Sequence, residues 1–370
     1  MSKKYRVGII GFGHMHINNV SQIYGKHPQV EWVACADTVP AVPELREAPY
    51  TRGWNLKKAL KDLGIPKAYK DWREMLEKEQ FDIIICTSEN AKHPEIVEAC
   101  AAAGVNVCVE KPMATSLSGA LQMVRAVQAA GTEMVINWPV VWFGAFRKVK
   151  ELIDEGVIGR VLQVKHRAAH TGPLGPGAAH TGVSEEAALL TGPERAAAWW
   201  HQVATGGGAM LDYCCYGAIL SRWYIGEQAV EAIGMKTNLN SHWGEAEDNA
   251  VMIVRFPSAM GLFEGSFTTW NHGVPTGPII YGTTGTLIVE QSVRLERGRG
   301  ETMIYEPDPL PEGREDIAAD FIHHLETGEP VHETIEMMFN LEIMAILDAG
   351  VRSARSGQLE TVASATWRIG

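Results

Sequence analysis

One lysine stands where acid–base chemistry is expected. Lys111 ends the stretch Asn-Val-Cys-Val-Glu-Lys, and Pro112 follows it directly. The apolar residues ahead of it predict a buried parallel strand, and ligands bind at the carboxyl ends of such strands in open α/β sheets. Partial desolvation lowers the pKa of a lysine, which would let Lys111 exchange a proton near neutral pH. Pro112 bends the chain away, and the Lys111–Pro112 bond is of the kind that can be cis. The alternative is a surface lysine that closes a strand.

A second group of reactive side chains follows three glycines at 206–208. The apolar segment after them predicts a helix whose first turn approaches a flat ligand. Asp212 and Tyr216 are four residues apart, so they share one face of that helix. A carboxylate and a phenol beside Lys111 would form a coupled acid–base set. The alternative is an aspartate of the first turn and a tyrosine of the core.

A glycine turn near the N-terminus predicts a dinucleotide site. An apolar strand at 6–10 runs into Gly-Phe-Gly-His-Met-His, and a helix continues to about Tyr24. Strand, glycine turn and helix together place a pyrophosphate on the helix N-terminus. His16 replaces the usual third small residue, which predicts looser helix packing or a side chain turned toward the ligand. The turn residues expected to contact the cofactor are Gly11, Phe12, Gly13, His14 and Met15.

Further cofactor contacts are expected at the ends of the next strands. The strand at 30–37 ends in Asp37, which would accept hydrogen bonds from ribose hydroxyls and repel a 2′-phosphate, so NAD is favoured over NADP. The alternative is a helix-cap or turn aspartate. His93 faces the cofactor or packs within its own helix. The other residues expected to contact the cofactor are Thr87, Glu89, Asn90, Glu110 and Lys111.

The order of predicted elements defines the fold class. Strands at 6–10, 30–37, 81–86, about 105–110 and 134–137 alternate with helices, as in a doubly wound Rossmann sheet. After Asn137, strands at 161–168, 229–237, 250–256, 260–268, 279–282 and 286–290 have few helices between them, and two late helices follow at 317–326 and 333–355. We therefore expect an α/β Rossmann dinucleotide-binding domain (1–136), then an α+β domain with an open, mainly antiparallel sheet for substrate binding and oligomerisation (137–370). The open face of that sheet predicts a homodimer or homotetramer.

Composition restricts the partners. The chain has 370 residues, 46% of them hydrophobic, and a net charge of -11. This charge, without any Lys/Arg cluster, argues against nucleic acid or an anionic membrane as partner. No apolar run is long enough to span a bilayer, and the N-terminus does not resemble a signal peptide. The six cysteines lack metal-type spacing, which is typical of reduced thiols, so a cytoplasmic protein is expected.

A glycine- and proline-rich segment interrupts the second half. It starts near Ala168, contains Ala-Ala-His-Thr-Gly twice, and reaches Trp199. Loops of this length are typical of lids or mobile segments. His170 and His201 could bind substrate hydroxyls or serve as loop and cap residues. The tryptophans that could stack on a sugar, or simply pack in the core, are Trp138, Trp142, Trp200 and Trp270.

Together these motifs resemble the Gfo/Idh/MocA oxidoreductases, which include glucose-fructose oxidoreductase and inositol dehydrogenase. The resemblance spans the whole chain and implies hydride transfer between NAD(P) and a secondary hydroxyl or ketone of a sugar, cyclitol or related polyol. It also implies that Tyr216 is the acid–base group, with its pKa lowered by Lys111. Lys111 would bind the substrate oxygen, and Asp212 would orient the substrate or Lys111. Whether Lys111 or Tyr216 is the base stays open. Many members have histidine at the position of Tyr216, and Cys214 departs from the family's Asp-x-Gly.

Three other functions are compatible with the motifs. One is an NAD-retaining glycosidase of the same family that oxidises, eliminates and re-reduces. The second is a sensor that binds NAD without turnover, which the intact set of Lys111, Asp212 and Tyr216 disfavours. The third is a metal hydrolase, which the spacing of the histidines does not support, so no metal is expected. Its ligands would be His166, His170, His180 and His201.

Overall fold

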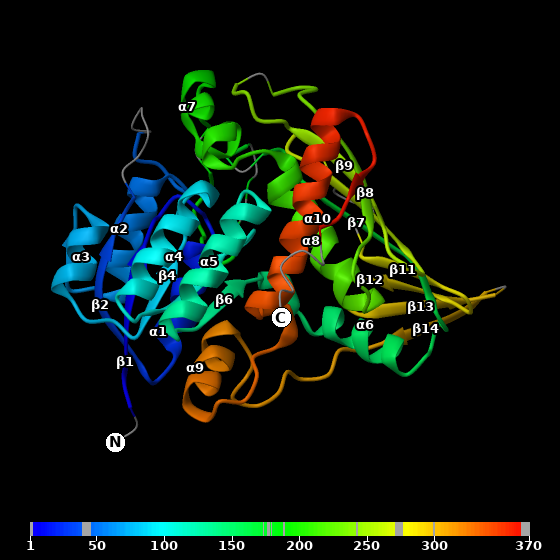
Figure 1. Cartoon of the computed structure of the whole chain (residues 1–370), viewed down its shortest axis with the longest axis horizontal. Helices are drawn as coiled ribbons and strands as arrows, with labels where there is room; N and C mark the ends of the chain where they lie inside the picture. Colours follow the sequence, from blue (N-terminus) through cyan, green and yellow to red (C-terminus); the bar gives the residue numbers. More distant parts are fainter. Residues whose placement is uncertain are drawn as a thin grey trace.

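The computed structural model describes residues 3–38, 46–172, 174–175, 178, 180–187, 189–241, 243–270, 277–298 and 300–363. Two sheets form the framework (Figure 1). The first belongs to the N-terminal part of the chain, drawn in blue to cyan, and the second to the C-terminal part, drawn in green to red. Two long helices, α8 (Ala209–Ile225) and α10 (Met337–Ser356), lie between them.

The first sheet has six parallel strands in the order β3-β2-β1-β4-β5-β6, which is the Rossmann order. Its central strands are buried on both faces, because helices cover both, and this explains their continuous apolar runs. The strands are β1 (Tyr5–Ile10), β2 (Val30–Ala36), β3 (Ala68–Tyr69), β4 (Ile83–Cys86), β5 (Asn106–Glu110) and β6 (Met134–Asn137).

The crossover helices begin at polar caps. Ser116 accepts a hydrogen bond from the Gly119 N–H at 3.2 Å and starts α5, and Asp71 accepts one from the Arg73 N–H at 2.8 Å and starts α3. The helices of this half are α1 (Ile17–Lys26), α2 (Arg52–Leu63), α3 (Trp72–Lys78), α4 (His93–Ala102) and α5 (Leu117–Ala130). All expected elements of this half are present, which confirms the Rossmann prediction.

The second sheet has nine strands in the order β14-β13-β12-β11-β7-β10-β9-β8-β15. The β7–β10 pair is parallel and the other pairs are antiparallel, so the sheet is mainly antiparallel, as expected. Helices α8 and α10 cover its inner face, and the opposite face exposes apolar side chains such as Met235 and Met260. The strands are β7 (Val161–Ala169), β8 (Glu231–Thr237), β9 (Asn249–Arg255), β10 (Met260–Ser266), β11 (Ile279–Gly282), β12 (Thr286–Val289), β13 (Val293–Arg297), β14 (Glu301–Tyr305) and β15 (Glu360–Thr361).

Sequence patterns missed several elements of this half. Strands β13 and β14 form a hairpin in a segment where no strand was expected, and α7 (Gly192–Ala197) lies inside the predicted loop. Helix α9 (Ile317–Thr327) occurs where it was predicted, and α6 (Gly144–Asp154) precedes the second sheet. Some positions of the predicted loop, 173, 176–177, 179 and 188, lie outside the described residues, as do residues 39–45.

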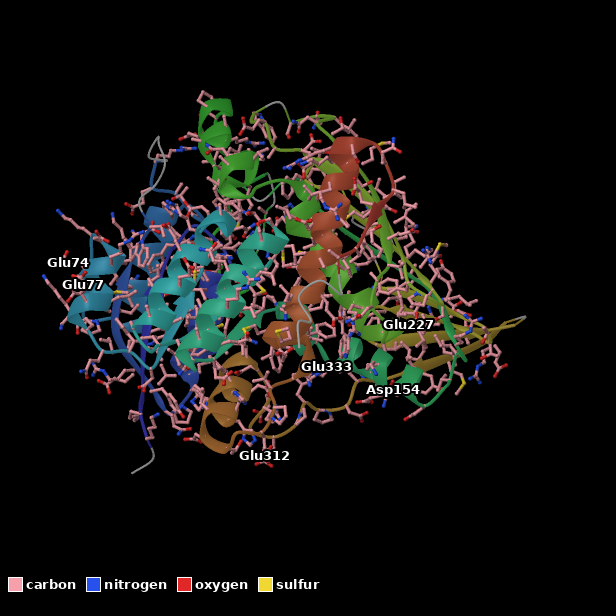
Figure 2. All side chains as sticks on the ribbon, in the orientation of Figure 1. Glu74, Glu77, Asp154, Glu227, Glu312 and Glu333 are labelled. Carbon is pink, nitrogen blue, oxygen red and sulfur yellow. The ribbon has the colours of Figure 1, made fainter. Side chains whose placement is uncertain are left out.

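The surface is rich in acidic groups on both halves. Figure 2 shows Glu74 and Glu77 pointing outward from α3 and Glu312 pointing outward near α9. In the described parts of the chain, no helix is both long and apolar enough to cross a lipid bilayer.

Candidate active site

Lys111 and Asp212 meet at the junction of the two halves. Lys111 lies at the end of β5, where the Lys111–Pro112 bond is cis, and Asp212 lies in the first turn of α8. The Lys111 ammonium nitrogen is 2.6 Å from Asp212 Oδ1 and also donates to the Asp212 carbonyl at 3.0 Å. The Lys111 side chain is only 2% exposed, so the surface-lysine alternative is wrong.

Tyr216 completes this group. It lies one turn beyond Asp212 on α8, and the Lys111 nitrogen is 4.8 Å from the centre of its ring. Trp138 packs edge-on against the same ring with centroids 5.6 Å apart, and His166 of β7 lies on another side at 6.4 Å. The structure therefore brings together the three residues predicted to carry acid–base chemistry.

The protonation states differ from those expected. Burial disfavours the Lys111 cation and is the largest single effect, but the Asp212 carboxylate together with the other acidic groups nearby outweighs it, so the pKa of Lys111 is raised well above its usual value instead of lowered. Burial also raises the pKa of the Tyr216 phenol, and neighbouring Lys111 only partly offsets this, so the expected lowering is wrong. Both groups hold their protons at neutral pH in the free protein.

The glycine turn has the geometry of a dinucleotide site. Gly11 has φ of +90°, and a Cβ there would lie 2.5 Å from the Ser88 backbone. Thr87 donates its hydroxyl to the Gly11 carbonyl at 2.7 Å, and the His14 N–H donates to the Thr87 carbonyl at 3.0 Å. Thr87 therefore supports the turn. Met15 is buried in a small apolar cluster with Trp199 and Trp200.

Asp37 is held by the same turn and by an arginine that sequence reasoning missed. Asp37 Oδ1 accepts from the Phe12 and Thr38 N–H groups, each at 2.9 Å, and Oδ2 lies 3.1 Å from Arg52 Nε. Arg52 also donates to Glu89 Oε1 at 2.5 Å. Burial raises the pKa of Asp37, while Arg52 opposes this. Arg52 had no signal in the sequence, because a helix-start arginine is common.

A cavity of about 540 Å³ opens beside these residues. Its lining includes Gly13, Asp37, Arg52 and Glu89 from the first half and Trp199 and Trp200 from the segment before α8. Its size and its acidic end fit the adenosine half of a dinucleotide. Asn90 adds a polar group near the turn. Its amide donates to the Gly206 carbonyl at 2.9 Å, and its buried Oδ1 has no hydrogen-bond partner in the described part of the chain.

The segment before α8 lies over the glycine turn. Trp199 donates its indole N–H to the Gly13 carbonyl at 2.9 Å, and Tyr50 donates to the Glu185 carbonyl at 2.9 Å. Gln22 donates to the Gly182 carbonyl at 3.1 Å. The described part of the predicted loop is thus docked on the first half. The sequence prediction named Trp200 as a binding residue but not Trp199, although the two tryptophans are adjacent in the chain.

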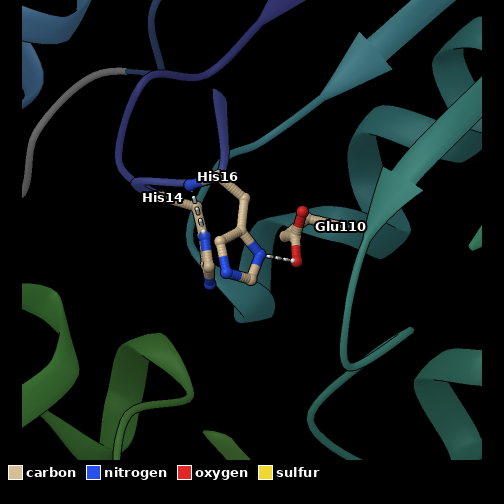
Figure 3. A group of neighbouring side chains, drawn as sticks. All are labelled: His14, His16 and Glu110. Atoms are coloured by element: carbon tan, nitrogen blue, oxygen red, sulfur yellow. Dashed lines mark hydrogen bonds and ion pairs between the residues drawn. The ribbon is translucent and has the colours of Figure 1, made fainter. Parts of the chain in front are cut away.

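His16 and Glu110 explain the missing third glycine. The His16 ring turns toward Glu110, with Nδ1 2.8 Å from Oε1, and His14 lies beside it with ring centroids 4.5 Å apart (Figure 3). Glu110 is fully buried and also accepts from the Asn137 amide at 2.8 Å. The position that is small in the fingerprint therefore holds a side chain that binds the glutamate of the Glu-Lys-Pro motif.

His93 does not face the cofactor cavity. It is fully buried, and its two ring nitrogens lie 3.2 Å from the Met113 carbonyl and 3.3 Å from the Ser88 carbonyl. The ring is thus held between two backbone carbonyls, one of which accepts its N–H, so the packing alternative for His93 is the correct one.

The residues expected to bind substrate have divided roles. Trp138 is buried and donates its indole N–H to Asn340 at 2.7 Å, so it supports Tyr216 and is not an open stacking surface. Trp200 packs on Trp199, with centroids 4.7 Å apart. His201 is buried between aromatic rings, and burial lowers its pKa to about 4.

His170 has a partner that the sequence did not suggest. Its Nδ1 accepts from the Gly172 N–H at 2.9 Å, so Nε2 carries the proton and donates to the Tyr213 hydroxyl. Because the Tyr213 hydroxyl accepts this hydrogen bond, its own proton is left to donate to another acceptor. Tyr213 directly follows Asp212 in α8. Of the other tryptophans, Trp142 packs on Arg147 and Trp270 is exposed.

Comparisons with known proteins agree with this architecture. A profile described as "Oxidoreductase family, NAD-binding Rossmann fold" matches residues 5–137, and one described as "GFO/IDH/MocA C-terminal domain" matches residues 146–288. The chain belongs to the Gfo/Idh/MocA family. This chain is similar to myo-inositol 2-dehydrogenase of Thermotoga maritima, with 26% identity over 271 residues, covering 70% of this chain and 68% of that protein.

Other relatives have related names. The 1,5-anhydro-D-fructose reductase of Ensifer adhaerens is 29% identical over 250 residues, covering 65% of this chain and 69% of the reductase. The crystal structure of aldose-aldose oxidoreductase from Caulobacter crescentus superposes with a TM-score of 0.76 at 19% identity, covering 97% of this chain and all of that one. The protein is therefore a member of a sugar and polyol oxidoreductase family that uses NAD and acts on CH–OH groups.

Proposed function

We propose that this Gfo/Idh/MocA protein transfers hydride between NAD and a secondary hydroxyl or ketone of a sugar, cyclitol or related polyol. The observation that carries the proposal is the meeting of Lys111, Asp212 and Tyr216 where β5 ends and α8 begins. A buried ammonium and a phenol beside one another can bind a substrate oxygen and exchange its proton.

Each side chain has a role in this proposal. Lys111 donates a hydrogen bond to the reacting oxygen, and Asp212 holds its ammonium in place. Tyr216 exchanges the proton, and Trp138 fixes the orientation of its ring. A bound cofactor would supply the hydride chemistry, with NAD⁺ as acceptor in oxidation and NADH as donor in reduction. Because the free protein keeps the Tyr216 proton, the site is prepared to protonate the oxygen of a ketone, and oxidation requires that this proton first leave.

Cofactor selection and substrate contacts follow the same logic. We propose that Asp37 binds the adenosine ribose and disfavours NADP, with Gly11, Phe12, Gly13, His14, Met15, Glu89 and Asn90 around the rest of the cofactor. Lys111 and Glu110 adjoin its nicotinamide end. On the substrate side, His170 would act through Tyr213, whose hydroxyl proton is free to donate.

The domain division and the assembly complete the proposal. Residues 1–136 would bind NAD, and residues 137–370 would bind the substrate and a second copy of the chain. The second sheet supports this, because its strand pairing places Ile233, Met235, Ile253 and Met260 on the open face, each more than 40% exposed. Light scattering of Met235→Glu should show smaller particles than wild type, and an unchanged mass would exclude this face.

A substrate screen tests the activity. Purified protein is mixed with NAD and a panel of aldoses, ketoses, inositols and anhydrosugars, and reduced cofactor is followed by absorbance. Turnover of at least one polyol, absent in Lys111→Met, is the expected result. Hydrolysis of a glycoside without net reduced cofactor would point to the glycosidase chemistry instead.

A further inference from the structure

We propose that His14, His16 and Glu110 form a binding site for a zinc-like divalent transition-metal ion. One ligand atom from each residue lies within 4.8 Å of the other two. Among the described residues, this is the group of three His, Cys, Asp or Glu side chains whose ligand atoms lie close enough to share one ion. Figure 3 shows both imidazoles of the glycine turn and the carboxylate at the end of β5 gathered at one point. The four histidines considered for a hydrolase do not take part.

The charge balance at Glu110 calls for a cation. The carboxylate is fully buried, and its hydrogen-bond partners are the Asn137 amide and the His16 ring. In the described parts of the chain, no lysine or arginine forms an ion pair with it, because neighbouring Lys111 is bound to Asp212. Buried carboxylates are normally paired with a cation or coordinate a metal. An ion shared with the imidazoles would supply that charge.

His14 provides an independent indication. Its side chain is 4% exposed, and its Nε2 has no hydrogen-bond partner among the described residues. A buried ring nitrogen without a partner is costly, and a ligand satisfies it. Because His14 Nδ1 accepts only a 3.2 Å bond from the His16 N–H, a change of tautomer that frees the Nε2 lone pair gives up little.

The geometry needs only a small adjustment. Zinc lies about 2.0–2.2 Å from nitrogen and oxygen ligands, so ligand atoms on one ion are up to roughly 4 Å apart. A modest rotation of the side chains would bring the ligand atoms from within 4.8 Å of one another to the roughly 4 Å that one ion requires. The ion would take the place of the hydrogen bond between His16 and Glu110, and the ring proton of His16 would move to Nε2, so the neutral imidazole serves as the ligand. Two imidazoles favour a transition ion over Mg²⁺ or Ca²⁺, which prefer oxygen ligands.

Metal titration tests the site independently of turnover. Chelator-treated full-length protein is titrated with Zn²⁺ by calorimetry and with Co²⁺ by visible absorption, whose intensity distinguishes a four-coordinate ion held by the protein from the six-coordinate ion in water. The variants are His16→Gly, which restores the small residue of the fingerprint, and Glu110→Gln, which keeps the shape and removes the charge. His27→Ala is the control, because His27 lies in the same half outside the cluster. Circular dichroism checks folding, and His14→Asn replaces any variant that does not fold.

The expected result is one ion per chain in the wild type and the His27→Ala control, with affinity reduced at least tenfold in both cluster variants. Absence of stoichiometric binding in the wild type would overturn the proposal. So would affinity in either cluster variant equal to that of the wild type.

Discussion

Cofactor selectivity gives the sharpest test of the NAD site, through the variant Asp37→Asn. The amide oxygen of asparagine can still accept the Phe12 and Thr38 N–H groups that now bond to Asp37 Oδ1 at 2.9 Å, so the turn keeps its geometry. The negative charge is lost, however, and the amide NH₂ faces Arg52, which is 3.1 Å from Oδ2 in the wild type.

The structure sets the size of the two effects. Hydrogen bonds to a charged acceptor contribute about 1.5–3 kcal/mol, so losing the ribose contacts should weaken NAD binding about 10- to 100-fold. A 2′-phosphate about 4 Å from a carboxylate is repelled by roughly 4 kcal/mol per unit charge near a protein surface. Removing this repulsion and releasing Arg52 should strengthen NADP binding at least tenfold. Glu89 limits the gain, because Arg52 remains paired with it.

The assay is fluorescence titration with NADH and NADPH on wild type, Asp37→Asn, Arg52→Gln and the double variant. If Arg52 binds the 2′-phosphate, the double variant loses most of the NADPH gain, and the cycle isolates the Arg52 contribution. An unchanged ratio of NADH to NADPH affinity in Asp37→Asn would remove Asp37 from the cofactor site. A gain for NADPH that persists in the double variant would refute the role of Arg52.

Three further predictions concern the catalytic group. Lys111→Met should abolish turnover while NADH still binds. The control is Lys165→Met, which lies on the open face of β7. Wild-type rates in Lys111→Met would refute the role of Lys111. Asp212→Asn leaves the buried Lys111 ammonium without its carboxylate. Urea denaturation should show a free energy of unfolding lower by about 3–5 kcal/mol. A loss below about 1 kcal/mol would show that the ion pair does not hold the two halves together. Because burial raises the pKa of Tyr216, the phenol loses its proton only as pH rises. The kcat/KM for oxidation should therefore increase toward alkaline pH, and the kcat/KM for ketone reduction should not. An oxidation rate that falls over that range would exclude Tyr216 as the base.

The order of elements was largely readable from the sequence, because local patterns encode it. Buried parallel strands have continuous apolar runs, and the turn after β1 needs glycine at position 11 for its positive φ. Asp212 and Tyr216 could be placed on one face because the helical period is fixed. The β13–β14 hairpin was not predicted because β14 is mostly exposed, so its sequence does not alternate between apolar and polar residues as that of a half-buried strand does.

The protonation states could not be read from the sequence. A lysine at a strand end can have a raised or a lowered pKa, depending on whether a carboxylate lies nearby, and Asp212 is 101 residues away along the chain. Burial of Tyr216 depends on packing against Trp138 and His166, which come from different elements. Both expected shifts had the wrong sign for this reason.

The sequence by itself therefore determined which residue types stand at the ends of strands and on the faces of helices, since these follow from short-range periodicity. The tertiary structure decided which of them meet: Arg52 with Asp37, Tyr213 with His170, and His16 with Glu110. Electrostatic effects on a side chain act through space and weaken with distance, so they depend on neighbours that chain order does not reveal.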